Sequence, residues 1–412
     1  MRGRIIHTTM AALPAPRTLA PRSDVVVVGA GVLGLGHAVE AVRAGLQVTV
    51  VDAEERLLGA SVRGFGHACV AGQPAPLRPA ALDTRERWLD LGARAGFWVG
   101  DAGTLAVARG LDELAVLTQL RDERDGVGIT MLDADDTARR LGPGARQVVG
   151  GALLTEDVRI EPRHAVPALA AWLAHQPGVR FLWSTHVHSV TDGLVQTSRG
   201  DLHADHAVIC LGHDLDRLLP DVAAAAGLRR CRQHMLRLAP PDRTRIAPAV
   251  ITGLSMLRQP ALAAQPAADD VRRRIAAERP ELVEHDVDLV LAQRPDGDLV
   301  VGDTHDLRAG VDPFSSESLD RLLLDETARL LGVPGLHVKE RWLGVHAEGD
   351  DDVLVHALDA RTTVVSATHG VSVGLGLAAD VVRRVVAGRA LPAVVRPPAR
   401  LCFFRDNRAT RS

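Results

Sequence analysis

Three glycines near the N-terminus have a spacing that suits phosphate binding. Gly29, Gly31 and Gly34 follow a run of valines at 25–28. Between a strand and a helix, the first such glycine permits a tight turn, the second lets backbone approach a pyrophosphate, and the third lets the helix pack on the strand. The helix N-terminus adds N–H donors and a partial positive charge. We therefore predict dinucleotide contacts from Gly29, Ala30, Gly31, Leu33 and Gly34.

An acidic residue at the end of the next apolar run extends this pattern. Residues 37–44 are typical of a helix, and the β-branched run at 47–51 leads into Asp52, 18 residues after Gly34. A carboxylate in this place can accept hydrogen bonds from ribose hydroxyls. The sequence thus predicts a β–α–β unit that binds a dinucleotide, with Ala53 next to the ribose-binding acid.

The composition excludes several other classes of protein. The chain has 412 residues, 46% hydrophobic and 24% charged, which suits a globular protein of two or three packed units. A net charge of −3 gives no basic field for nucleic acid, and the longest apolar run, 25–36, is too short to span a membrane. The four cysteines form no CxxC pair, and His186 and His188 lack a third ligand, so we predict no metal site. Tyrosine is absent, and Lys339 is the single lysine.

The order of strand and helix patterns predicts interleaved domains. Apolar runs at 178–182, 204–212 and 363–366 continue the nucleotide-binding unit, and short strands separated by turn residues lie between them. After the last run we expect a turn at Gly374 and Gly376, close to the ligand, and then a helix. We predict an α/β protein with a doubly wound, Rossmann-like domain and an interleaved substrate domain built on an antiparallel sheet.

The boundaries follow from these patterns. The nucleotide-binding domain is predicted to comprise residues 24–95, 150–227 and 345–393, and the substrate domain residues 96–149 and 228–344. Residues 1–23 lack the apolar core of an export signal, so we expect a flexible leader on a cytoplasmic protein. Residues 394–412 are predicted to form a tail.

Six segments, in order, resemble those of a flavoenzyme superfamily. They are residues 29–34, GASVRGFG at 59–66, residues 151–162 with the helix that follows, the strand at 207–212, RWLGVH at 341–346 and THG at 368–370. Over about residues 24–393 the chain resembles the FAD-dependent amine oxidoreductases of the D-amino-acid oxidase, glycine oxidase and sarcosine oxidase superfamily. The resemblance implies non-covalent FAD, held by the residues above and by Ser61, Arg63, Gly66, His67, Val187, Leu211, Gly212, Thr368, His369 and Gly370. Some relatives tether FAD through a histidine in the region of His67, so contact and tethering are both open there.

Two segments are similar to one branch of this superfamily. They are residues 59–66 and QRPDGDLVVGDTHD at 293–306. The genes of this branch often lie beside phosphonate-catabolic genes, and Gly64 replaces an asparagine of its pattern. The resemblance implies an aminophosphonate substrate, such as 2-aminoethylphosphonate or its N-methyl form.

His346 departs from the amino-acid-acting relatives, which have an arginine at this position. That arginine grips the substrate carboxylate through two parallel hydrogen bonds. Its loss disfavours a plain α-amino acid, so Arg63, His305 and His346 are our candidates for binding and catalysis. The alternative is that His346 makes a core contact and another arginine holds the anion.

The reaction that the resemblance implies is oxidation of the C–N bond of a small amine that carries an anionic group. A hydride passes from the carbon next to nitrogen to the flavin, and the imine is hydrolysed. Dioxygen or another acceptor then takes the electrons. The alternatives are a glycine, sarcosine or D-amino-acid oxidase, a nicotinamide-dependent dehydrogenase that uses the same glycines, and a flavin-binding subunit without redox activity.

Overall fold

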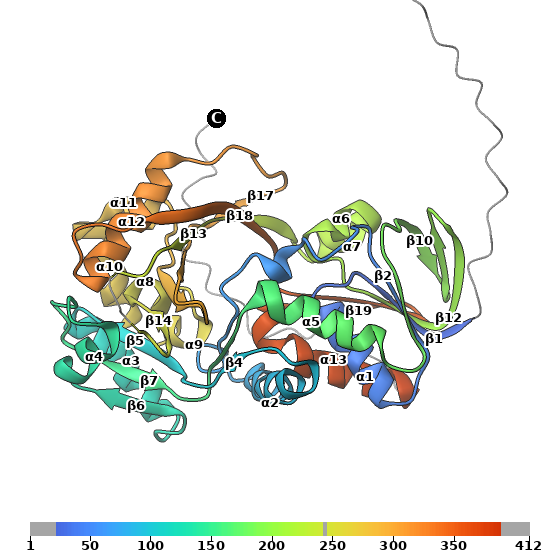
Figure 1. Ribbon diagram of the computed structural model, residues 1–412, viewed down its shortest axis with the longest axis horizontal. Helices are drawn as coiled ribbons and strands as arrows, with labels where there is room; N and C mark the ends of the chain where they lie inside the picture. Colours follow the sequence, from blue (N-terminus) through green and yellow to red (C-terminus); the bar gives the residue numbers. More distant parts are fainter. Residues whose placement is uncertain (1–21, 242–244, 389–412) are drawn as a thin grey trace, which may run out of the picture.

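The computed structural model describes residues 22–241 and 245–388. Two large sheets lie side by side (Figure 1). A third, small sheet is made of β3 (His67–Ala68), β8 (Val158–Ile160) and β4 (Val99–Gly100). Residues 1–21 of the predicted leader and the whole predicted tail lie outside the described residues. In the part of the chain that is described, no helix combines the length and apolarity needed to cross a bilayer.

The first sheet has eight strands and is parallel at its centre. Its order is β10-β11-β12-β1-β2-β9, and β20 pairs with β12 and β19. The parallel strands are β1 (Ser23–Val28), β2 (Val48–Val51), β9 (Val179–Leu182), β12 (Gly200–Ile209) and β20 (Thr362–Ala367). The antiparallel edges are β10 (Val187–Thr191), β11 (Leu194–Thr197) and β19 (Val353–Asp359).

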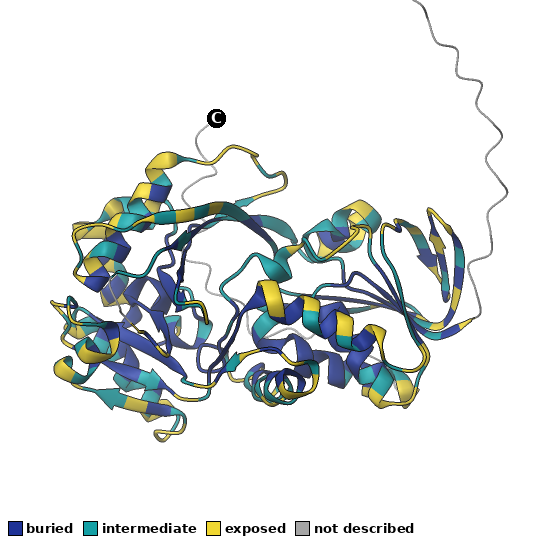
Figure 2. Cartoon of the chain, in the orientation of Figure 1, coloured by how far each residue is buried: buried dark blue, intermediate teal, exposed yellow. Residues whose placement is uncertain are grey.

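Both faces of this sheet are covered, as a parallel sheet requires. Val25 and Val27 of β1 belong to a core shared with α1 (Val32–Arg43), α2 (Arg78–Ala95), α5 (Pro162–Ala174) and α13 (Gly370–Val386). Val26 and Val28 point to the other face, where α6 (Leu215–Leu218) and α7 (Pro220–Ala225) pack. Figure 2 shows the strands buried between these layers. The predicted α/β class, with a doubly wound sheet, is confirmed.

One local prediction is wrong. Gly374 and Gly376 lie inside α13 and not in a turn before it. A Cβ on Gly374 would lie 3.0 Å from a methyl of Leu33, and one on Gly376 would overlap the carbonyl of Ala80. These glycines therefore let α13 approach α1 and α2 closely, which is a packing role.

The second sheet has nine strands and is mostly antiparallel. Its order is β17-β13-β16-β15-β14-β5-β7-β6, with β18 paired to β13, and only β14 and β5 run parallel. The strands are β5 (Thr104–Ala108), β6 (Ile129–Leu132), β7 (Gly150–Leu154), β13 (Arg229–Leu238), β14 (Ala249–Ile251), β15 (Val290–Gln293), β16 (Leu299–Gly302), β17 (Asp306–Arg308) and β18 (Val338–Glu348).

Seven helices share the core of this sheet. They are α3 (Leu111–Glu123), α4 (Ala134–Leu141), α8 (Gly253–Met256), α9 (Pro260–Ala263), α10 (Ala268–Glu278), α11 (Pro280–Glu284) and α12 (Glu317–Leu331). The predicted domain boundaries at 150 and 345 fall at the start of β7 and inside β18, and both strands belong to the second sheet. The division into domains stays a prediction.

Candidate active site

A cavity of about 560 Å³ is lined by residues of both large sheets. Val28 and Asp52 come from the carboxyl ends of β1 and β2, and Gln233, Val290 and His346 come from β13, β15 and β18. Ligands of open α/β sheets bind beyond the carboxyl ends of the strands. All predicted site residues except Ala30 and Gly34 line this one cavity.

The three glycines of the first turn have separate structural reasons. Gly29 has φ +100°, and a Cβ there would lie 2.5 Å from the carbonyl oxygen of Cys210. A Cβ on Gly34 would overlap the carbonyl of Gly29, so Gly34 lets α1 pack on the turn. A Cβ on Gly31 would meet only the Ser61 hydroxyl, at 3.1 Å. Gly31 is therefore the member of the trio whose missing side chain leaves space in the cavity.

Asp52 is tied to the glycine turn. Its carboxylate accepts hydrogen bonds from the N–H of Ala30 at 2.7 Å and of Glu54 at 2.9 Å. Burial raises the pKa of Asp52, and these two N–H groups oppose that shift. The carboxylate thus fixes the turn while it lines the cavity.

The loop at 59–66 crosses from the first turn toward the second sheet. The Ser61 hydroxyl, in the short 3₁₀ helix η1 (Ala60–Val62), accepts a hydrogen bond from the N–H of Val32 at 2.9 Å. Arg63 donates from Nε to the carbonyl of Leu58 at 2.8 Å, and no carboxylate among the described residues pairs with it. Its guanidinium lines the cavity and, because no acid in the described part of the chain neutralises it, can bind an anion there.

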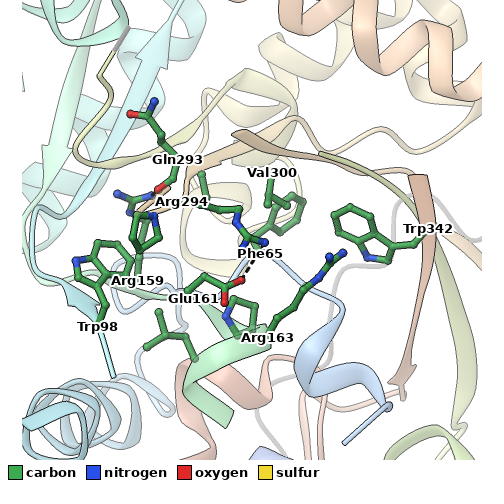
Figure 3. A pocket seen from close by; sticks show the side chains of 14 residues that line it. Phe65, Trp98, Arg159, Glu161, Arg163, Gln293, Arg294, Val300 and Trp342 are labelled. Atoms are coloured by element: carbon green, nitrogen blue, oxygen red, sulfur yellow. Dashed lines mark hydrogen bonds and ion pairs between the residues drawn. The ribbon is translucent and has the colours of Figure 1, made fainter. Parts of the chain in front are cut away.

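A small hollow of about 10 Å³ lies behind this loop and shares Gly64 and Phe65 with the cavity (Figure 3). The Arg163 guanidinium lies 4.4 Å from the ring centroid of Trp342. The indole N–H of Trp342 donates to the carbonyl of Arg63 at 2.8 Å. The aromatic residue of the 341–346 segment therefore holds the backbone of Arg63 in place.

The imidazole ring of His67 contacts polar side chains on the side of the loop that faces the second sheet. Its Nε2 lies 2.7 Å from the Thr104 hydroxyl and 3.2 Å from a carboxylate oxygen of Asp157. Asp157 also accepts the N–H groups of Val70 and Ala71. This ring nitrogen is therefore engaged within the protein.

The remaining predicted cofactor residues reach the cavity from later elements. Gly212 has φ +55°, and no atom lies within 4 Å of the place its Cβ would take. His369 is the N-cap of α13, and Thr368 precedes it. Val187, Leu211, Gly212, Thr368, His369 and Gly370 all line the cavity.

Two predicted histidines meet in the cavity wall. The rings of His305 and His346 lie edge to face, with centroids 6.3 Å apart. Gln233 of β13 lies between polar groups, with its Oε1 3.2 Å from His346 Nδ1 and its Nε2 3.4 Å from His305 Nε2. Burial holds the pKa of His305 well below its usual value and lowers the pKa of His346 to about 4. Both rings are therefore neutral near pH 7 and act as hydrogen-bonding groups.

Arg258 is a cavity residue that the sequence analysis did not single out. It follows α8 in an apolar segment and its side chain is 20% exposed. Its guanidinium bonds to Asp286 at 2.5 Å and lies 3.6 Å from Glu348. The sequence does contain a signal for Arg258, because it is a single charged residue inside an apolar run. A cation in such a place is buried only when acidic or other polar groups pair with it.

Asp288 and Asp303 are two further cavity residues that sequence reasoning missed. Together with His305 they bring one ligand-capable atom each within 4.8 Å of the others. In the described part of the chain, two other groups share this property, namely His67, Cys69 and Asp157, and Cys231, His346 and Glu348. Of these three groups, only the one formed by Asp288, Asp303 and His305 contains two carboxyl groups that line the cavity.

The residues of the cavity fit FAD. At Gly31 and at Gly212 no side chain keeps the backbone away from a bound cofactor. Arg63 supplies a positive charge that no acid among the described residues neutralises and that can bind the anionic pyrophosphate. Asp52 lies at the end of β2, where a ribose-binding acid is expected. The same cavity is also lined by His305 and His346.

The fold is similar to that of several solved flavoenzymes. Glycine oxidase from Geobacillus kaustophilus superposes with a TM-score of 0.72 and 18% identity, over 91% of this chain and 97% of that chain. Iminodiacetate oxidase from Chelativorans sp. gives 0.68 and 19%, over 90% and 97%. L-α-glycerophosphate oxidase from Mycoplasma pneumoniae, solved with FAD bound, gives 0.67 and 20%, over 91% and 100%.

The sequence itself identifies the family. A comparison with curated proteins gave no match. The family profile described as FAD dependent oxidoreductase (DAO) matches residues 24–384, which is most of the chain. The protein therefore belongs to the DAO family of FAD-dependent oxidoreductases, and FAD is its cofactor.

Proposed function

We propose that this protein oxidises the C–N bond of a small amine that also carries an anionic group. The observation that carries the proposal is the shared cavity, because the FAD-binding turn and the wall of His305, His346 and Arg258 line the same space. Bound FAD supplies the acceptor for a hydride from the carbon next to nitrogen. Two structural neighbours, glycine oxidase and iminodiacetate oxidase, are named for oxidising amines.

In this proposal the chain holds FAD without a covalent bond. Asp52 binds the adenosine ribose, Gly31 lets backbone approach the pyrophosphate, and the Nε2 of His67 stays bonded to Thr104 and Asp157. The remaining predicted residues contribute backbone and small side chains around the cofactor. The protein's share of catalysis is to orient the substrate carbon and exclude water from the cavity.

The proposed substrate is an aminophosphonate, such as 2-aminoethylphosphonate or its N-methyl form. The histidine at 346 cannot clamp an α-carboxylate as an arginine does, because one neutral ring offers a single donor. Arg63 lacks a carboxylate partner in the described ranges, and its guanidinium lines the cavity. A phosphonate is tetrahedral and lies one carbon farther from the nitrogen than an α-carboxylate does. Several separate hydrogen-bond donors suit it better than the two parallel N–H groups of one arginine.

The prediction from this proposal concerns relative rates. With one preparation of holoenzyme, kcat/KM for N-methyl-2-aminoethylphosphonate or 2-aminoethylphosphonate should exceed that for sarcosine, glycine and D-alanine by at least about tenfold, or about 1.4 kcal/mol of transition-state preference. Each amino acid would bury a carboxylate without its bidentate partner. If sarcosine, glycine or D-alanine is preferred by the same margin, the aminophosphonate assignment is wrong.

A further inference from the structure

We propose that the paired carboxyl groups of Asp288 and Asp303, with His305, form the subsite that receives the substrate's protonated amino group and takes one proton from its nitrogen. This inference rests on the proposed amine oxidation. It adds an acid–base function to residues that neither the family match nor the structural neighbours assign.

The two acids are brought together by the hairpin of β15 and β16. Val290 pairs with Gly302 in this antiparallel ladder, so Asp288 and Asp303 lie at the same end of the two strands. The N–H of Asp288 donates to the carbonyl of Asp303 at 2.9 Å. Both side chains line the cavity although Asp288 is only 7% and Asp303 only 1% exposed. The pair therefore has a fixed backbone and faces the substrate space.

Each acid has a buried oxygen that the described residues leave without a hydrogen bond. Asp303 Oδ2 accepts from the amide of Gln233, but Asp303 Oδ1 has no hydrogen-bond partner. His305 Nδ1 lies 3.5 Å from Asp303 Oδ1 and contacts the carbonyl of Asp286 at 3.2 Å instead. Asp288 Oδ1 is likewise buried and without a partner. Buried acceptors in a substrate cavity indicate a donor that arrives with the ligand.

The charges around the pair also favour a cation. Arg258 is the nearby guanidinium, and it already faces Asp286 and Glu348. Several titratable groups interact electrostatically with the pair and its neighbours. They are Arg258, Asp286, Glu348, Cys231, His67, His305, His346 and His369. Four carboxyl groups thus face one arginine, while the rings of His305, His346 and His369 are neutral near pH 7. An ammonium group would balance this excess of acid.

The same surroundings make the pair a stronger base than an exposed carboxylate. Burial and the carboxyl group of Asp288 raise the pKa of Asp303 well above its usual value, and burial raises the pKa of Asp288. Two such carboxyls titrate as a coupled pair, which retains one proton more readily than a lone acid. A base acts best when its pKa approaches the working pH.

The proton transfer balances without any further reactant. One N–H bond of the ammonium group breaks and one O–H bond forms on the carboxylate, so a cation and an anion become a neutral amine and a carboxylic acid. The nitrogen lone pair released in this step is what permits hydride loss from the neighbouring carbon. No group is oxidised or reduced in the step itself.

The main test is the pH dependence of Asp303→Asn and Asp288→Asn holoenzymes, with Asp306→Asn as the matched control. Asp306 pairs with Arg232 and Arg308 and does not line the cavity. For the best amine, the rising limb of the pH profile of kcat/KM should move to higher pH by about one unit or more in the two cavity variants. On that limb kcat/KM should be about tenfold below the wild-type value. The difference should become smaller at higher pH, because more of the amine is then already deprotonated in solution. The control should keep the wild-type profile. Profiles lowered by the same factor at every pH would overturn the proton-acceptor role.

A second measurement uses only the wild-type holoenzyme, in case the variants do not fold. The ligand is the N,N,N-trimethyl form of 2-aminoethylphosphonate, which has a permanent positive charge and no N–H to lose. Its affinity, followed by the change in flavin absorbance, should increase as the carboxyl pair ionises with rising pH. Affinity that is independent of pH would contradict the subsite.

Two outcomes separate this inference from its alternatives. If a chelator abolishes amine oxidation and a divalent cation restores it, the pair holds a metal ion and the amine subsite is wrong. If amines reduce the flavin but the variants keep parallel profiles, this inference fails while the proposed function stands. If no amine reduces the flavin, the proposed function fails first.

Discussion

Replacing Gly31 by valine should give a folded protein that retains almost no FAD. Gly31 has φ −65° and ψ 176°, which any residue can adopt, so the backbone is not strained by the change. Its Cβ would lie 3.1 Å from the Ser61 hydroxyl, and the two methyl groups beyond it would occupy the cavity at the first turn. The measurement is visible flavin absorbance per mole of purified protein, beside the circular dichroism spectrum.

Two controls make the Gly31→Val result specific. Gly34→Val should damage the fold itself, because its Cβ would overlap the carbonyl of Gly29 and separate α1 from the turn. Gly335→Val should change neither flavin content nor the fold, since nothing lies within 4 Å of its Cβ position. A Gly31→Val protein with wild-type flavin content would refute the placement of the pyrophosphate.

Replacing Arg258 by glutamine should lower the free energy of unfolding by about 3 kcal/mol or more, because it removes the cation from a buried ion pair. The Arg258 guanidinium bonds to Asp286, and the side chain of Glu348, also close to it, is only 6% exposed. Burial lowers the pKa of Arg258, but these acids outweigh it and raise the pKa overall. Urea unfolding of the holoenzyme measures the change.

The matched control for Arg258→Gln is Arg308→Gln. Arg308 also pairs with an aspartate, Asp306, but its side chain is 62% exposed. An exposed pair of this kind contributes less than about 1 kcal/mol. Equal losses in the two variants would show that the buried pair has no special contribution to stability.

The first sheet was predictable because its strands carry a strong local signal. Four consecutive valines at 25–28 are buried on both faces, and the glycine turn follows at once. The turn predicted at Gly374 and Gly376 was wrong because two glycines in an apolar segment have two uses. They permit a turn, but they also permit close contact between helices, and the carbonyl of Ala80 lies where a side chain on Gly376 would be.

The cavity residues were predictable only in part. Arg63, His305 and His346 line one cavity, and each lies in a segment that resembles a flavoenzyme motif. Arg258 and Asp288 lie outside those segments, and Asp303 lies in the segment at 293–306 but was not singled out there. Asp288 meets Asp303 because of the register of β15 and β16, and Arg258 reaches them from the segment after α8. A register between strands is a long-range property that local patterns do not specify.

Anaerobic mixing of the purified holoenzyme with single substrates tests the central claim most directly. The panel should contain N-methyl-2-aminoethylphosphonate, 2-aminoethylphosphonate, sarcosine, glycine, D-alanine and, as an alcohol that carries a phosphate, L-glycerol 3-phosphate. We predict rapid loss of flavin absorbance with an aminophosphonate, with release of the matching aldehyde and amine. The claim of C–N oxidation would be contradicted if dithionite bleaches the flavin but no amine does, or if glycerol phosphate alone does.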